Sequence, residues 1–159
     1  MDQNNFFIKN QISSNINDVE NLLSTGVFSA PILRLFQEPV FVSIILKLDD
    51  LLQKLRILNE RINFNNDITS GDITDLVNNV RNAICHLNSK ENILDEKNKI
   101  KFVFNMAIGK VNVIKIGEKM IGSDYDDDIA FFFGENRIYL KRHILRILEE
   151  SKNVCQKLY

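Results

Sequence analysis

The sequence predicts a mainly α-helical fold with a small antiparallel β-sheet inserted before the last helix. Apolar residues recur at intervals of three and four through much of residues 4–89 and again after residue 141, which is the spacing of one helix face. Between about residues 100 and 140 the pattern changes to short runs of β-branched and aromatic residues near glycines. With 159 residues, 45% of them hydrophobic, the chain is expected to form one domain, 1–159, of four to five helices.

Three helices are expected before residue 63. The first covers 4–23, where apolar residues follow helical spacing up to a glycine stop. A short second helix is expected within 28–36, because Pro31 suits a first helical turn. The third is a long core helix over 40–62, which Pro39 is expected to begin.

The stretch 72–89 follows a polar loop at 63–71 and predicts the helix on which the functional argument rests. Asp72 or Ser70 can cap it, because a short side-chain oxygen accepts a hydrogen bond from an unpaired amide of the first turn. One apolar stripe runs along it, formed by Ile73, Leu76, Val77, Val80, Ala83, Ile84 and Leu87. The charged stretch 90–99 is expected to be a solvated connection with one turn near Ile93.

The predicted sheet lies between residues 100 and 140. The runs 101–104 and 111–116 are typical of strands, and 129–133 with 137–140 predict a hairpin around a three-residue Gly-Glu-Asn loop. From residue 141 to 158 helical spacing returns, which predicts a last helix.

The face of the 72–89 helix opposite its apolar stripe is polar but almost uncharged. At about 100° per residue, and with Ile73 at zero, Arg81 falls near 80°, Asn82 near 180° and His86 near 220°. An exposed helix face more often carries Lys and Glu. Because Arg81 and His86 lie about 140° apart on such a helix, one helix alone is poorly placed to bring both onto one phosphate. A two-fold dimer that apposes two such faces solves this problem.

Arg81, followed by a polar residue and then by His86 five positions along, resembles the signature of the HEPN family of small helical RNA-cutting domains. The resemblance covers the 72–89 helix and extends more loosely to the helices on either side, with the sheet as an insertion. It implies a HEPN-like helical bundle and a homodimer formed through the Arg81 and His86 face. It further implies a metal-independent endoribonuclease without cofactors, acting as a bacterial toxin or anti-phage effector, with an antitoxin or regulatory protein as a further partner.

Arg81, His86 and Asn82 are the catalytic residues that this resemblance implies, and the chemistry needs these residue types. Histidine exchanges protons near neutral pH, so it can accept the ribose 2′-hydroxyl proton or protonate the leaving 5′-oxygen. Arginine offers paired donors to the charged phosphate oxygens. Asn82 would orient His86 of the neighbouring chain or donate to the phosphate. The alternative is a catalytically inactive module of the same type that binds RNA or serves as a protein-interaction scaffold.

A basic cluster follows the predicted hairpin. One interpretation is a track for the RNA backbone that leads to the catalytic residues. The other is a solvated helix face balanced by Glu149 and Glu150. The cluster consists of Arg137, Lys141, Arg142 and Arg146.

The acidic run 124–128 resembles part of a calcium loop. Ile129 occupies the position where such a loop needs glycine, so an acidic turn before a strand is expected instead, and no metal site is predicted. Contact with a basic partner is the other interpretation of this run.

Composition limits the remaining classes. The formal charge of −1, from 20 basic and 21 acidic residues, argues against binding long nucleic acids by net charge alone. Two cysteines without a disulfide framework favour a reducing compartment. Residues 1–11 show neither a basic leader nor a long apolar segment, so a cytoplasmic protein without a membrane segment is expected.

Overall fold

The computed structural model describes residues 3–86, 90–95, 97 and 99–158. Four α-helices lie in this part of the chain, and the helices predicted at both ends of the sequence are confirmed. Two 3₁₀ turns, η1 (Pro31–Leu33) and η2 (Lys90–Asn92), and a π-helical segment, η3 (Leu140–Leu145), accompany them. The α-helices are α1 (Gln3–Ser24), α2 (Arg34–Ile57), α3 (Ile73–Cys85) and α4 (Arg146–Leu158).

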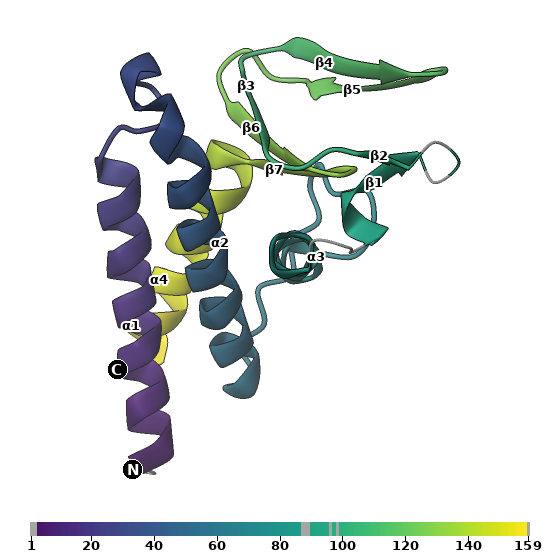
Figure 1. Ribbon diagram of the computed structural model, residues 1–159. Coiled ribbons are helices and arrows are strands. Elements are labelled where there is room, and N and C mark those ends of the chain that lie inside the picture. The colour runs from purple at the N-terminus through teal and green to yellow at the C-terminus, as the bar shows by residue number, and fades with distance from the viewer. Residues whose placement is uncertain (1–2, 87–89, 96, 98, 159) are drawn as a thin grey trace.

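Seven short strands form three separate antiparallel sheets among the described residues. The central sheet has the order β3-β6-β7, and β1-β2 and β4-β5 are two-stranded. Figure 1 shows the β4–β5 hairpin reaching away from the helices, with α3 seen almost end-on below the strands. The strands are β1 (Ile93–Asp95), β2 (Ile100–Lys101), β3 (Asn105–Ile108), β4 (Val111–Ile116), β5 (Lys119–Ser123), β6 (Ile129–Phe133) and β7 (Asn136–Tyr139).

The predicted fold class, a mainly α HEPN-like bundle with one small inserted sheet, is wrong. The described strands form three sheets, and the central one is part of the core. The strand predicted at 101–104 is also wrong, because only Lys101 of that run lies in a strand, β2, and β3 begins at Asn105. Besides β3, two strands escaped prediction for a physical reason. β1 is too short to show alternation, and β5 carries Gly122, where a Cβ would overlap the carbonyl oxygen of Val111 on β4. Close approach of the two backbones therefore requires a residue that is otherwise unfavourable in strands.

Strand β6 is the reason that the sheet cannot be treated as an appendage. Phe131 and Phe133 belong to the main core with the four helices, whereas Ala130 and Phe132 point into a second core among the strands. A strand buried on both faces reads as a continuous apolar run. β6 thus occupies a place in the core that a helix would fill in a bundle.

Aromatic contacts join β6 to the helices. Phe41 of α2 stacks on Phe131 with ring centroids 4.4 Å apart, and Phe28 meets the same ring edge-on at 4.8 Å. All three side chains are buried. The main core is therefore a mixed layer of helices and sheet, with α1 packed on α2 and α4.

The long core helix is shifted from its predicted limits. α2 begins at Arg34, so Pro39 lies inside the helix, and it ends at Ile57 rather than at residue 62. Pro39 lacks the amide that would bond to the carbonyl of Leu35. The residue Leu35 is 87% exposed, so this turn of the helix lies at the surface, where the proline is tolerated.

The N-terminus of α3 confirms the predicted cap. Asp72 and Asp75 form a capping box, in which each carboxylate accepts a hydrogen bond from the other residue's backbone amide. Arg61 binds both carboxylates, which ties the loop before α3 to its first turn.

The hairpin of β6 and β7 lies where it was predicted, but its loop is shorter. Phe133 pairs with Asn136, so the loop has two residues instead of three and begins at Gly134, whose φ is 58°.

None of the described helices combines the length and the apolar character that crossing a membrane would require.

Candidate functional site

The C-terminal half of α3 carries a closed network of polar side chains. Nη1 of Arg81 donates to Oδ1 of Asn82 at 3.1 Å, and Nδ2 of Asn82 donates to Oδ1 of Asn78 at 3.1 Å. Asn78 in turn donates to Asp49 of α2 at 3.3 Å, and the Asp49 carboxylate lies 3.7 Å from Nε of Arg81. The network orients the guanidinium and leaves its Nη2 without an acceptor among the described residues.

His86 lies outside the helix, so the prediction that it shares one helix with Arg81 is wrong. α3 ends at Cys85, and His86 has extended backbone angles of φ −123° and ψ 95°. The helical-wheel offset therefore does not apply to His86. The predicted helical end at residue 89 falls in 87–89, outside the described residues. The His86 side chain is exposed and makes no hydrogen bond or ion pair with the described part of the chain.

Asn92 fixes the end of α3. This residue of η2 is buried, and its Nδ2 donates to the carbonyl oxygens of Ala83 at 2.8 Å and of His86 at 3.4 Å. Among the described residues, the Asn92 side chain is the donor that reaches these two carbonyls. Asn92 was not singled out from the sequence, since nothing in its local pattern distinguishes it from the many other asparagines.

Replacement of Asn92 by alanine is expected to reduce the free energy of unfolding by about 1–3 kcal/mol, because buried carbonyls lose their donor. Chemical denaturation measures this change. Asn112→Ala is the matched control, since Asn112 is exposed on β4 and a surface substitution stays within about 0.5 kcal/mol. Equal stability of the two variants would contradict the role assigned to Asn92.

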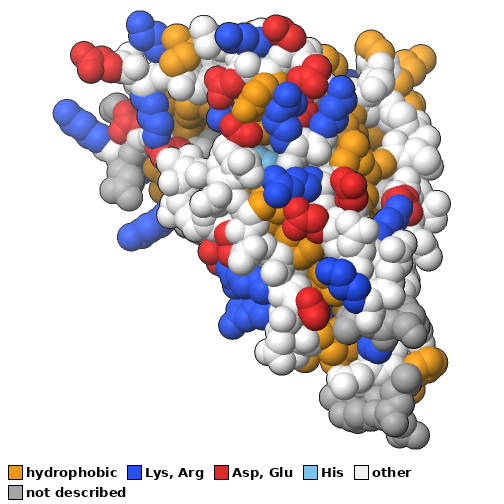
Figure 2. Space-filling view, turned by 180° about the vertical axis from the view of Figure 1, so that it is seen from behind, with side chains coloured by type: hydrophobic (Ala, Val, Ile, Leu, Met, Phe, Trp, Pro, Cys, Tyr) orange, Lys and Arg blue, Asp and Glu red, His pale blue; other side chains and the backbone are white. Residues whose placement is uncertain are grey.

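Two of the four residues of the basic cluster predicted to bind RNA pair with the acidic run 124–128. Arg137 pairs with Asp124 at 2.7 Å, and Arg142 with Asp127 at 2.9 Å. The Arg146 guanidinium binds Glu150 and lies 3.9 Å from the centre of the Phe64 ring. Lys141 is exposed, and its ammonium group has no acceptor among the described residues. On the face in Figure 2, acidic and basic side chains are interspersed.

Asp128 is the buried member of the acidic run. Its carboxylate accepts hydrogen bonds from the backbone amides of Ile129, Lys141 and Arg142 and from the Arg142 guanidinium, at 2.8–3.1 Å. It thereby joins the start of β6 to the start of η3. The run has a structural role at this position, and among the described residues no group of three or more His, Cys, Asp or Glu side chains is placed to hold a metal ion.

The second histidine, His143, is buried in the core. Nδ1 must accept, because its partner at 3.1 Å is the backbone N–H of Tyr139, so the proton lies on Nε2 and is donated to the carbonyl of Asn66 at 3.0 Å. Burial lowers the pKa of His143 below its ordinary value of 6.5, although Asp67 and Asp128 oppose this effect. His143 is therefore a neutral structural residue.

Acidification is expected to destabilise the protein through His143. Below pH 6.5 the His143 imidazole is protonated in the unfolded chain, whereas in the folded chain it is protonated only at lower pH. The free energy of unfolding therefore decreases as the pH is lowered through this range. Denaturation at pH 7.5 and at successive lower values measures it. His86→Ala should keep this dependence, whereas His143→Asn should lose it; an unchanged slope in His143→Asn would contradict the assignment.

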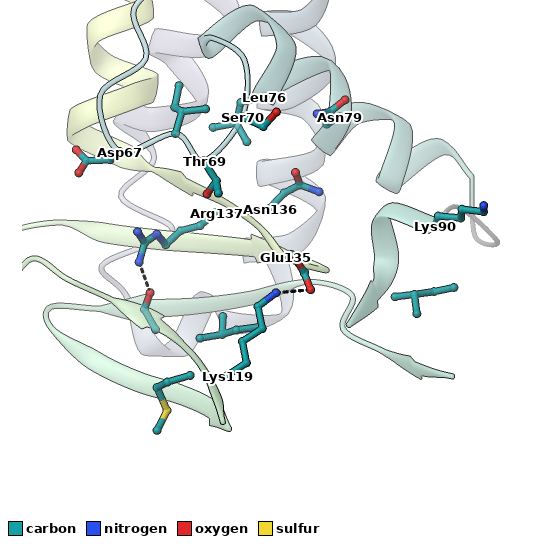
Figure 3. A pocket seen from close by; sticks show the side chains of 15 residues that line it. Asp67, Thr69, Ser70, Leu76, Asn79, Lys90, Lys119, Glu135, Asn136 and Arg137 are labelled. Carbon is teal, nitrogen blue, oxygen red and sulfur yellow. Dashed lines mark hydrogen bonds and ion pairs between the residues drawn. The ribbon is translucent and has the colours of Figure 1, made fainter. Parts of the chain in front are cut away.

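A polar cleft of about 520 Å³ opens on another side of α3. Its walls come from the loop before α3, from α3 and η2, and from strands β5 and β7. Figure 3 shows Asn79 of α3 above Asn136 of β7, with Lys119 and Glu135 paired below them. None of Arg81, Asn82 and His86 lines this cleft.

The structure thus brings together Arg81 and Asn82, and places His86 directly after their helix. Asn82 contacts Arg81 and Asn78 rather than a histidine. Asp49, which contacts Arg81 from α2, was missed because the Asp-Asp pair in that helix looks like an ordinary solvated position. Comparisons with models of protein families, with curated proteins and with solved structures found no match.

Proposed function

We propose that the chain is a metal-independent endoribonuclease that acts as a homodimer through the exposed end of α3. The observation that carries the proposal is the exposed imidazole of His86, which has no partner in the described part of the chain and directly follows the helix end that holds the Arg81 guanidinium. The HEPN-like Arg-x4-His wording points to the same residues. A role as a toxin or anti-phage effector in the cytoplasm, with a regulatory partner, is part of this proposal.

The proposed reaction uses the RNA itself as the nucleophile. The ribose 2′-oxygen attacks the adjacent phosphorus, the bond from phosphorus to the 5′-oxygen breaks, and a 2′,3′-cyclic phosphate and a 5′-hydroxyl are formed. The His86 imidazole of one copy takes the 2′-hydroxyl proton, and a water molecule protonates the departing 5′-oxygen. Arg81 binds the phosphate oxygens, on which negative charge builds.

Asn82 is assigned a different task from the one expected. Its carboxamide holds the Arg81 guanidinium and links it to Asn78, so we propose that it positions the arginine rather than the histidine. Asp49 completes the same network from α2. Orientation of a guanidinium before substrate binding reduces the conformational freedom that binding must remove.

Incubation of the purified protein with RNA in EDTA tests the reaction. Cutting is expected without divalent metal, with cyclic-phosphate and 5′-hydroxyl ends, whereas DNA should resist because it lacks the 2′-hydroxyl. Cutting that requires a divalent metal would refute the mechanism. Absence of cutting, with RNA binding or dimerisation retained, would favour the inactive binding or scaffold module.

Cys85 offers a direct test of the dimer. It is an exposed free thiol one residue before His86, whereas burial raises the pKa of the Cys155 thiol and makes it less reactive. A short bis-maleimide should link two copies of a Cys155→Ser variant through Cys85, and the Cys85→Ser variant should stay uncoupled. Monomers in size-exclusion chromatography, together with no cross-linked species, would contradict the proposed interface.

A further inference from the structure

The cleft beside α3 is connected to the proposed catalytic end of that helix. Lys90 lines the cleft from η2, and Asn92 of the same turn is hydrogen-bonded to the carbonyls of Ala83 and His86. η2 therefore joins the cleft to the end of α3 through a buried contact. One turn thus contacts both the cleft and the backbone of His86.

The cleft offers cations for an anionic group. Lys90, Lys119 and Arg137 line it. Lys119 pairs with Glu135 and Arg137 with Asp124, but these carboxylates are 52% and 65% exposed. Exposed ion pairs contribute little free energy, so a phosphate can take the place of either carboxylate.

Polar and apolar groups complete the lining. Asn79 is half-buried, and its amide makes no hydrogen bond with the described residues, so it is available to donate and to accept toward the cleft. The hydroxyls of Thr69 and Ser70 lie nearby, and Figure 3 places their loop beside Asn79 and Asn136. Leu76 and Ile121 supply apolar surface.

We propose that this cleft binds a nucleotide of single-stranded RNA next to the phosphate that is cut; this inference rests on the proposed function. A nucleotide uses all three kinds of lining group, since its base has apolar faces and hydrogen-bonding edges and its phosphate is anionic. Inorganic phosphate would use only the cations. The cleft then replaces the cluster of Lys141, Arg142 and Arg146 as the RNA contact.

Fluorescence anisotropy with a labelled, 2′-O-methylated single-stranded RNA tests the cleft without cutting. The Lys90→Ala/Lys119→Ala variant is expected to bind this RNA about tenfold more weakly. The slope of its log K against log salt concentration should be about 1.4 less steep than that of the wild type, because two phosphate contacts are lost. Asn79→Leu should weaken binding with the salt slope unchanged, because it removes a base contact. Competition by a mononucleotide or by inorganic phosphate compares the two ligand sources: the nucleotide should compete better, and equal competition would refute the base contact.

Lys152→Ala is the matched control. Lys152 on α4 is 45% exposed and pairs with Glu20, as Lys119 pairs with Glu135, so the substitution removes the same charge from a similar ion pair outside the cleft. It should change affinity less than twofold. An equal loss in this variant, wild-type affinity in both cleft variants, or no RNA binding by the wild type would overturn the cleft proposal.

The two proposals fail in distinguishable ways. If the wild-type protein binds RNA through the cleft but cuts nothing, the cleft proposal is supported and the catalytic function is refuted. If cutting depends on Arg81 and His86, but not on Lys90, Lys119 or Asn79, the catalytic function is supported and the cleft proposal is refuted. Thermal unfolding of each variant confirms that the fold is retained.

Discussion

Alanine at either Arg81 or His86 is expected to slow RNA cleavage by about 100-fold to 1,000-fold, which is the range for losing one proton-transfer group or one charge-stabilising donor. The reason differs between them. Arg81→Ala removes the guanidinium that the network with Asn82 and Asp49 orients toward the exposed face. His86→Ala removes an imidazole without a partner among the described residues, so the fold should be unaffected. Cleavage of a labelled RNA in EDTA measures both rates.

Mixing the two inactive variants tests whether the site is shared between copies. In a mixed dimer one chain keeps Arg81 and the other keeps His86, so one of two composite sites is complete. If half of the dimers are mixed, about a quarter of wild-type activity should return. If both single variants stay active, these residues are not part of the mechanism. If both are inactive and mixing them restores no activity, each site lies within one copy.

Asp128→Ala is expected to have the largest effect on stability, a decrease in the free energy of unfolding of about 3–5 kcal/mol, because it leaves backbone amides and a guanidinium without their buried acceptor. For a chain of this length that corresponds to a decrease in Tm of about 10 °C. The carboxylate is fully buried and joins the start of β6 to η3. Differential scanning calorimetry or urea denaturation measures the change.

Asp127→Ala is the control for this prediction. Asp127 precedes Asp128 and also pairs with Arg142, but its side chain is 62% exposed. It should therefore change stability little. Equal effects of the two substitutions would show that the acidic run acts by its charge alone and not through the buried hydrogen bonds of Asp128.

Several local features followed from the sequence because their causes are local. Apolar spacing predicted α1, and the N-terminus of α3 was predicted from Asp72, whose carboxylate needs only the first turn of its own helix. The strands β4 and β6 were predicted from apolar runs near glycines. Helix limits were less accurate, as α2 shows, because whether Pro39 can lie inside a helix depends on how its turn is exposed in the folded chain.

The candidate site was predictable only in part. Arg81 and Asn82 do share the polar side of α3, as the helical pattern predicts. The position of His86 was not predictable, because Asn92 ends the helix from outside it by supplying donors to the carbonyls of Ala83 and His86. Asp49 likewise reaches Arg81 from another helix.

What the sequence determined by itself is the presence of helices at both ends of the chain and of α3 with its cap at Asp72. Each depends on side chains a few residues apart, so periodicity and capping rules suffice. Only the tertiary structure decided that β6 is buried on both faces, that Arg137 and Arg142 pair with the acidic run, and that a polar cleft lies beside α3. These features join residues far apart in the chain, and the contacts that create them exist only after the strands and helices have packed together.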